Sequence, residues 1–236
     1  MGDIAYKLTI LLSRGAVLKH EDFVERWLEV ERRDPVAAPG LVRYVAHRPV
    51  AGPPPIAGAA AALYDAAIET SWRRKNDAAD WVTSGAFEQG WLPERLPLLA
   101  GRPAAVGGEP RVVWERECPA GASPITVLVL PVALQRLRFQ DFVAHWTGAH
   151  AQLALSGAHT RERLLRIEDT PAPTAPPSWF ARTRYDGVGA LTFTSTAALA
   201  EEFADEHYAR HVAPDERRFT DVGMSRALLV TEAHAY

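Results

Sequence analysis

Only one cysteine, Cys118, occurs in the chain, so no disulfide can form within it. A single thiol suits a reducing compartment. Basic residues are not in excess either: 26 lysines and arginines stand against 29 aspartates and glutamates, for a net charge of −3. This balance gives neither the basic surface that nucleic acid needs nor a polybasic segment for anionic lipid. We therefore expect no nucleic-acid partner and no membrane partner.

Long hydrophobic runs are also missing. The apolar run within residues 1–15 is too short and too interrupted for a membrane span, and no basic segment precedes it as in a signal peptide. The sequence lacks a glycine-rich phosphate loop, a serine nucleophile elbow and a Cys-x-x-Cys pair. What is present is a hydrophobic content of 47%, enough for a substantial core. These features predict a cytoplasmic globular protein.

A pattern of Phe-x-x-x-Trp occurs twice, at Phe23 and Trp27 and again at Phe142 and Trp146, 119 positions later. Other segments match in the same order. They are 64–72 with 185–193 (offset 121) and 112–115 with 229–232 (offset 117). Offsets that drift by a few residues are typical of a duplicated unit with small loop insertions.

Each copy predicts the same order of elements. Apolar, β-branched runs predict strands, and the Phe-x-x-x-Trp segments predict helices because residues four apart share a helix face. The expected strands are 6–14, 41–50, 64–72 and 111–116, then 125–132, 185–194 and 226–231, and helical regions are expected at 76–84, at 196–205 and after Pro93 and Pro214. Proline-rich runs at 51–62 and 171–177 predict surface loops. The order β-α-β-β-α-β is ferredoxin-like.

One face of such a sheet is covered by its helices and the other face is bare, so two units can bury their bare faces against each other. We therefore predict an α+β fold. Two tandem ferredoxin-like units, residues 1–118 and 124–236, would pack sheet to sheet as an intramolecular pseudo-dimeric α/β barrel. Such a chain need not dimerise to fold, and whether two barrels pair further is left open.

These segments resemble the EthD family of the dimeric α/β barrel superfamily. The residues that carry the resemblance are Phe142, Trp146 and His150, then Pro39, Gly40, Leu41 and Tyr44, then Tyr185–Val188, and finally Asp215, Glu216 and Phe219. The resemblance covers nearly the whole chain as two copies. It implies a small pocket between helices and sheet, lined in related lactone isomerases by the helix histidine and the strand tyrosine. It implies no cofactor, although haem-binding relatives exist elsewhere in the superfamily.

Neither copy holds the family's full residue set, and the helix position differs most clearly. His150 in the second copy aligns with Glu31 in the first. An imidazole with a pKa of about 6.5 can accept or donate a proton at neutral pH, so His150 is the first catalytic candidate. The alternative is a histidine that hydrogen-bonds a carbonyl at the helix edge. Glu31 is a base only if burial raises its pKa, and the dense charge around it favours a solvated helix end.

Tyr44 and Glu69, both in the first copy, are the other catalytic candidates. Tyr44 could donate a hydrogen bond to a substrate oxyanion, or its ring could simply pack with the hydroxyl in solvent. Glu69 needs a partner if it faces inward, and the sequence leaves its face open. The second copy places Leu165 or Arg166 at the position of Tyr44. The aromatic pairs Phe23 with Trp27 and Phe142 with Trp146 would line the two pockets, with plain core packing as the alternative.

The sequence indicates two functions. The first is a cofactor-free acid–base enzyme (an isomerase, dehydratase or cyclase) acting on a small carbonyl or lactone compound, with His150 moving the proton. The second is a binding or accessory protein with degenerate pockets, which the split residue set favours. Haem binding through His150 is a third and weaker reading. His207 and His211 have metal-site spacing but no third ligand, so no metal is expected. We further predict that His150 points into a cavity, whereas Glu31 reaches solvent or pairs with a base.

Overall fold

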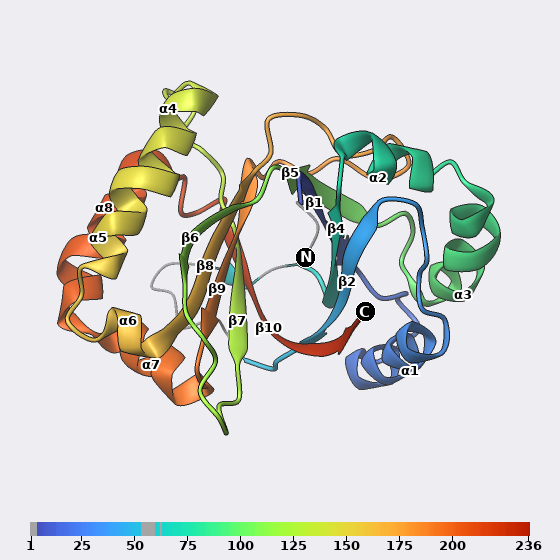
Figure 1. Cartoon of the computed structure of the whole chain (residues 1–236), viewed down its shortest axis with the longest axis horizontal. Coiled ribbons are helices and arrows are strands. Elements are labelled where there is room, and N and C mark those ends of the chain that lie inside the picture. The colour runs from blue at the N-terminus through green and yellow to red at the C-terminus, as the bar shows by residue number, and fades with distance from the viewer. Residues whose placement is uncertain (1–3, 53–59, 62) are drawn as a thin grey trace.

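A central sheet lies between two outer layers of helices in the computed structural model, which describes residues 4–52, 60–61 and 63–236 (Figure 1). Much of the proline-rich run at 51–62 is outside these residues. The first half of the chain contains β1 Tyr6–Leu12, α1 His20–Arg33, β2 Leu41–Pro49, β3 Ala60–Ala61, β4 Ala66–Trp72, α2 Lys75–Trp81, η1 Ala86–Trp91, α3 Leu92–Arg95, η2 Leu96–Leu98, β5 Ala104–Gly108 and β6 Arg111–Glu115. No helix in the described part of the chain is long and apolar enough to cross a membrane.

The second half repeats this order. It contains β7 Ile125–Leu130, α4 Phe139–Ala144, η3 His145–His150, α5 Ala151–Leu155, α6 Thr160–Arg163, β8 Leu164–Pro171, β9 Gly187–Phe193, α7 Thr196–Ala204, η4 Tyr208–Val212, α8 Ala213–Phe219 and β10 Arg226–Ala235. The sheet runs β5-β1-β4-β2-β10-β7-β9-β8-β6, with β3 beside β10. The strands β5-β1-β4-β2 and β10-β7-β9-β8 each follow the ferredoxin-like order, and the first half adds β3 and β6 at other places in the sheet. The predicted pseudo-dimeric barrel fold is confirmed.

The last strand of each half is shared between the two sheets. In the first half, β5 pairs with β1, whereas β6 pairs with β8 of the second half. In the second half, the first part of β10 pairs with β7 and its later part pairs with β2 (Figure 1). The expected strand at 111–116 is therefore real, but it completes the other half's sheet. The strand beside β1, with the sequence AAVGG, was not predicted because four of its five residues are alanine or glycine, which are depleted in strands.

Alternation along β1 sends its side chains to two different cores. Tyr6, Leu8 and Ile10 pack against the helices of the first half. Leu11 packs in the cluster between the two sheets, and Lys7 points to the same side by the period of two. A corresponding helix-facing core in the second half contains Val127 and Phe193. The space between helices and sheet, where the family pocket is expected, thus exists in both halves.

Candidate active site

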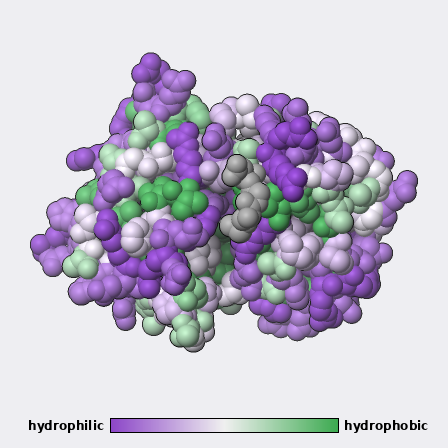
Figure 2. Space-filling view, in the orientation of Figure 1, coloured by the Kyte–Doolittle hydropathy of each residue, from purple (hydrophilic) through white to green (hydrophobic). Residues whose placement is uncertain are grey.

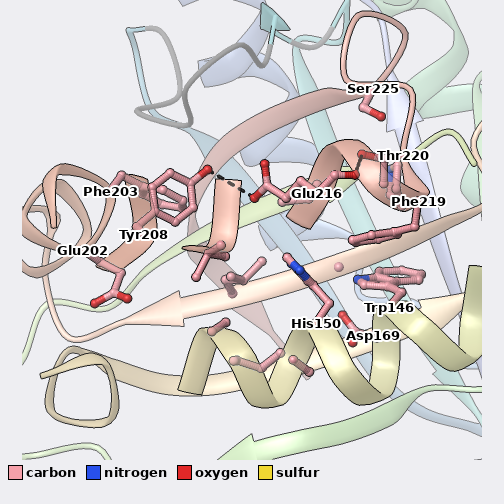
Figure 3. Close-up of a pocket in the computed structure, with 18 of the residues that line it drawn as sticks. Trp146, His150, Asp169, Glu202, Phe203, Tyr208, Glu216, Phe219, Thr220 and Ser225 are labelled. Atoms are coloured by element: carbon pink, nitrogen blue, oxygen red, sulfur yellow. Dashed lines mark hydrogen bonds between the residues drawn. The ribbon is translucent and has the colours of Figure 1, made fainter. Parts of the chain in front are cut away.

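A cavity lies between the helices and the sheet of the second half, and with its open mouth it holds about 1050 Å³ of empty space (Figure 3). Its walls are mostly apolar, as is usual for small-molecule sites. They include Trp146, His150, Ile167, Asp169, Gly189, Phe193, Phe203, Tyr208, Val212, Glu216 and Phe219. The outer surface of the molecule is mostly hydrophilic, but a band of apolar surface crosses the second half (Figure 2).

His150 lies at the end of a π-helical segment, and this local geometry fixes its role. Its Nδ1 is 3.0 Å from Oδ2 of Asp215, and Nε2 of His145 is 2.9 Å from the same oxygen. Residues five apart reach one partner because a π-helix, with i to i+5 hydrogen bonds, places them on one face. With Nδ1 donating to the carboxylate, Nε2 is the acceptor left for a ligand. Burial lowers the pKa of His150 below its ordinary value, more than Asp215 raises it, so the ring is neutral at pH 7.

Asp169, on β8, is a buried acid with an unused oxygen. It is 3% exposed, and its Oδ2 has no hydrogen-bond partner among the described residues. Burial, together with neighbouring Glu168, raises the pKa of Asp169 to about 8 against the opposing effect of Arg111. A carboxyl group in this state is protonated at pH 7 and can donate a hydrogen bond.

Glu216, on α8, is a second acid in the same cavity. The hydroxyl of Tyr208 donates a hydrogen bond to its Oε1 at 3.2 Å (Figure 3). Burial raises the pKa of Glu216 to about 7, and the Tyr208 hydrogen bond only partly opposes this. Glu216 can therefore gain or lose a proton near neutrality, beside a neutral imidazole and a protonated Asp169. Groups with such displaced pKa values gather at sites that transfer protons.

Two glycines let Trp146 approach the sheet closely. A Cβ atom on Gly187 would lie 2.7 Å from the Trp146 ring, and one on Gly189 would lie 3.2 Å from it. The first-half equivalent of Gly189, by the offset of 121, is the fully buried Ile68. The glycines of the Tyr-Asp-Gly-Val-Gly segment thus accommodate the indole and leave the floor of the cavity open.

Comparison with known proteins identifies this part of the chain. Residues 134–223 match the model of the EthD domain family. This segment is therefore similar to an EthD domain, and that name denotes residues 134–223 below. It carries His150, Asp169, Asp215 and Glu216, and with them most of the cavity. None of the curated protein sequences matches the chain.

Solved structures of similar shape extend over nearly the whole chain. An anthrone oxidase-like protein has a TM-score of 0.67 at 14% identity and covers 99% of this chain and 93% of its own. A candidate monooxygenase from Fusobacterium nucleatum subsp. nucleatum has a TM-score of 0.59 at 5% identity, covering 98% and 94%. A chlorite dismutase from Candidatus Nitrospira defluvii, in complex with imidazole, has a TM-score of 0.54 at 13% identity, covering 98% and 91%. At these identities the likeness shows the fold alone, a dimeric α/β barrel.

The same space in the first half is filled. Trp72, Trp81, Phe87 and Trp91 are all buried there and pack on one another, with ring centroids 4.8 to 5.8 Å apart. The offset of 121 aligns them with Phe193, Glu202, Tyr208 and Val212 of the EthD domain. Trp179, from the loop between β8 and β9, packs on Phe87 from the second half. Large aromatic side chains thus occupy the volume that the EthD domain leaves empty.

Glu31 is fully buried, so the expected solvated helix end is wrong and the alternative, pairing with a base, is the one that the structure shows. It pairs with Arg95, whose Nε and Nη2 donate to the two carboxylate oxygens at 2.8 and 2.9 Å. The Trp27 indole and the Tyr44 hydroxyl also donate to Glu31, each at 2.8 Å. This bidentate, fully bonded pair gives the position equivalent to His150 a structural role in the first half.

Tyr44 likewise has no free hydroxyl for a substrate. It is 0% exposed, donates to Glu31 and accepts a hydrogen bond from the Trp91 indole at 3.1 Å. Tyr44 pairs with Thr70 in the sheet. Leu191 is the second-half equivalent of Thr70, and it pairs with Ile167. The second-half counterpart of Tyr44 is therefore Ile167, one residue beyond the expected Leu165 or Arg166, because both strands carry an irregularity in their pairing there.

Glu69 faces the interior between the sheets, away from the cavity. Its carboxylate contacts Lys7 Nζ at 2.8 Å and His47 Nε2 at 2.8 Å, and Lys7 also contacts Glu168 at 2.6 Å. Burial raises the pKa of Glu69, but Lys7 and His47 lower it by more, so the carboxylate is ionised. This cluster joins the sheets of the two halves and leaves Glu69 no role in the pocket.

The other residues expected to line pockets divide in the same way. Trp146 lines the cavity. Phe142 lies behind it, fully buried against Trp146 and Phe219. Phe23 and Trp27 are fully buried in the first-half core. The residues that sequence reasoning missed are Asp169 and Glu216, although Glu216 stands in the Asp-Glu-x-x-Phe segment that carried the family resemblance.

Haem, which some proteins of the wider superfamily bind, does not fit the chemistry of this cavity. Its two propionates need cations, whereas the described lining has one Lys or Arg side chain, Arg226, whose Nη1 donates to the carbonyls of Gly223 and Ser225. Asp169 and Glu216 add acidic groups instead. Outside the cavity, His207 bonds the Leu153 carbonyl at 2.9 Å rather than standing free for a metal.

Proposed function

We propose that the EthD domain is a cofactor-independent proton-transfer enzyme acting on a small, mainly apolar carbonyl compound. One observation carries the proposal: His150, fixed by Asp215 in the tautomer with a free Nε2, lines an apolar cavity that also holds two carboxyl groups of raised pKa. A neutral imidazole beside protonated acids provides both a base and a proton donor at one pH.

The proton movements follow from these positions. His150 Nε2 accepts a proton from the carbon next to the carbonyl group, and the electrons of that C–H bond move to the carbonyl oxygen to form an enolate. A protonated carboxyl group of the cavity stabilises the enolate by hydrogen bonding. Return of the proton to another carbon completes an isomerisation, and loss of a leaving group instead completes a dehydration. The alternative is a binding protein that holds such a molecule without reaction.

The test is exchange of the carbon-bound protons of 2-tetralone, a compact aromatic ketone, followed by NMR in D₂O. We expect the wild-type protein to accelerate exchange over buffer, and His150→Gln to lower the rate to the buffer value. His207→Gln removes a histidine outside the cavity and serves as the control. If the protein binds 2-tetralone but does not accelerate its proton exchange, the binding function is the better explanation. If His150→Gln exchanges the protons as fast as the wild type, His150 has no part in the mechanism.

A further inference from the structure

Asp169 is a buried polar group that the fold does not need. Its equivalent in the first half is Ala46, by the pairing of Ala46 with Ile68 and of Asp169 with Gly189. A buried carboxyl group without a partner is unfavourable, because it has lost its hydrogen bonds to water and gained none in return. Since alanine is sufficient for packing at the equivalent position, the carboxyl group of Asp169 needs another explanation. A ligand that forms a hydrogen bond with it provides one.

The position of Asp169 shows where that ligand lies. Its Oδ2 is unpartnered, and the side chain lines the cavity close to Trp146 and His150 (Figure 3). Gly189, which pairs with Asp169 across the strands, has no side chain to cover the carboxyl group. A Cβ atom at this position would contact Asp169 Oδ1 at 3.4 Å. The rest of the surrounding wall is mostly aromatic and apolar. A ligand oxygen that reaches Asp169 therefore belongs to a flat, mainly apolar molecule.

We propose that Asp169 binds a neutral carbonyl oxygen of the ligand as a hydrogen-bond donor, and so makes the cavity select uncharged ketones over carboxylates. The proposal rests on the proposed function only in using the same cavity. Asp215 adds a negative charge behind His150, and Glu216 adds a second acid. A carboxylate ligand would lie near the ionised Asp215 in a mostly apolar cavity, whereas a ketone offers the acceptor that Asp169 lacks.

Three probes of one shape separate these contributions: 2-acetylnaphthalene (a ketone), 2-isopropenylnaphthalene (a hydrocarbon) and 2-naphthoate (an anion). Binding is measured by equilibrium dialysis at pH 6.5. We expect the ketone to bind about tenfold more tightly than the hydrocarbon, the usual value of one hydrogen bond, and more tightly still than the anion. Equal affinity of ketone and hydrocarbon, or no binding of any probe up to its solubility, would overturn the proposal.

Variants at one position then assign the preference. Asp169→Asn keeps a donor and should keep the preference for the ketone, whereas Asp169→Leu should abolish it. Glu168→Gln is the matched control, because Glu168 is the next residue of β8 and points to Lys7 between the sheets. A ketone preference that survives in Asp169→Leu contradicts the proposal.

A pH series gives a second readout that needs only the folded wild type and Asp169→Asn. The ketone preference of the wild type should fall above pH 8 as Asp169 ionises, and that of Asp169→Asn should not. The charged or titratable groups that face Asp169 or its immediate partners are His150, His145, Asp215, Glu216, Glu168 and Arg111. Since they are common to both proteins, only the difference between the two profiles reports Asp169, and identical profiles would overturn the assignment.

The outcome is separable from that of the proton-transfer proposal. His150→Gln should lose exchange of 2-tetralone while keeping the preference for ketone over hydrocarbon. If the protein prefers the ketone over the hydrocarbon but does not accelerate proton exchange, the proton-transfer proposal is wrong and the role of Asp169 in ligand selection is supported. Exchange without the preference does the reverse.

Discussion

The two halves of this barrel place different side chains on one scaffold. In the first half, Trp81 and Trp91 are packed between helices and sheet, whereas the EthD domain has Glu202 and Val212 at the equivalent positions. Since protein interiors are packed to near crystal density, losing two indoles without compensation leaves a hole. The comparison indicates that the cavity reflects smaller side chains at equivalent positions of a shared strand and helix order.

The halves differ equally in how they treat charge. Glu31 and Arg95 form a closed ion pair in the first half. Their equivalents by sequence offset are His150 and Glu216, which do not form such a pair and face the cavity instead. One half thus uses its polar positions to fix the packing, and the other leaves them available to a ligand.

The largest expected effect comes from separating the halves. We expect residues 1–118 alone not to fold cooperatively, because β6 would lose β8, β2 would lose β10 and the inner face of the sheet would be exposed. Circular dichroism during urea unfolding, with the full chain as control, checks this. A soluble monomer of the fragment with a sharp unfolding transition would show that each half is independent.

Next in size is the ion pair of the first half. Arg95→Leu leaves Glu31 buried without its cation and should cost about 3–5 kcal/mol of unfolding free energy. The equivalent change in the EthD domain, Glu216→Leu, should cost less than about 1 kcal/mol, because Glu216 is partly exposed and its one side-chain bond is long. The double variant Glu31→Leu with Arg95→Leu should recover part of the loss. Urea denaturation gives all the values, and equal costs in the two halves would break the comparison.

Filling the cavity with a large side chain tests whether its empty space is what allows the second half to bind a ligand. Val212→Trp restores the residue found at Trp91, and we expect 2-acetylnaphthalene to bind about ten- to hundredfold more weakly, since sharing the space costs about 1–3 kcal/mol. Val212→Ala, which leaves the cavity open, is the matched control. Both are measured by equilibrium dialysis. Unchanged affinity in Val212→Trp would place the ligand elsewhere.

The smallest effect is a pH dependence of stability. The folded protein holds a proton on Asp169 up to about pH 8, whereas the unfolded chain releases it near 3.8. Stability from this group is therefore full at low pH and is lost as the pH rises through that range. Between pH 7 and pH 8 we expect the wild type to lose about 1 kcal/mol relative to Asp169→Asn, because each pH unit below the folded pKa is worth about 1.4 kcal/mol and the loss tapers off near that pKa. Chemical denaturation at both pH values measures it, and parallel changes would argue against a protonated Asp169.

The sequence was sufficient for the fold because repeat spacing and apolar periodicity report on local structure. Phe142 and Trp146 had to cover a sheet, and they do. The cavity was harder to predict, because it depends on which residues face each other across layers. Nothing in the residue types of Val212 and Gly189 shows that they face a cavity. This becomes evident only in the structure, where Trp91 and Ile68 fill the corresponding space of the first half.

Charge assignments failed for a related reason. Glu31 stands among charged neighbours in the sequence, and its partner Arg95 is 64 positions away. Asp169 looks like one more acid after Glu168, yet strand alternation sends Glu168 to Lys7 and Asp169 to the cavity. The exact strand register would have separated the two acids, but the alignment of the two copies left this register uncertain by one residue, enough to exchange the two faces of the strand.

The shared last strands also determine when each half can complete its sheet during synthesis. The sheet of the first half is completed at β2 by residues 230–235 of β10, and the backbone of Tyr44 pairs with Tyr236 beyond them. A ribosome must therefore deliver residue 236 before the first half can close its edge. Until then β2 has an open edge that another chain could pair with. The first half, whose helix–sheet space is filled by aromatic side chains, is thus made first but completes its sheet only when the last residues have been made.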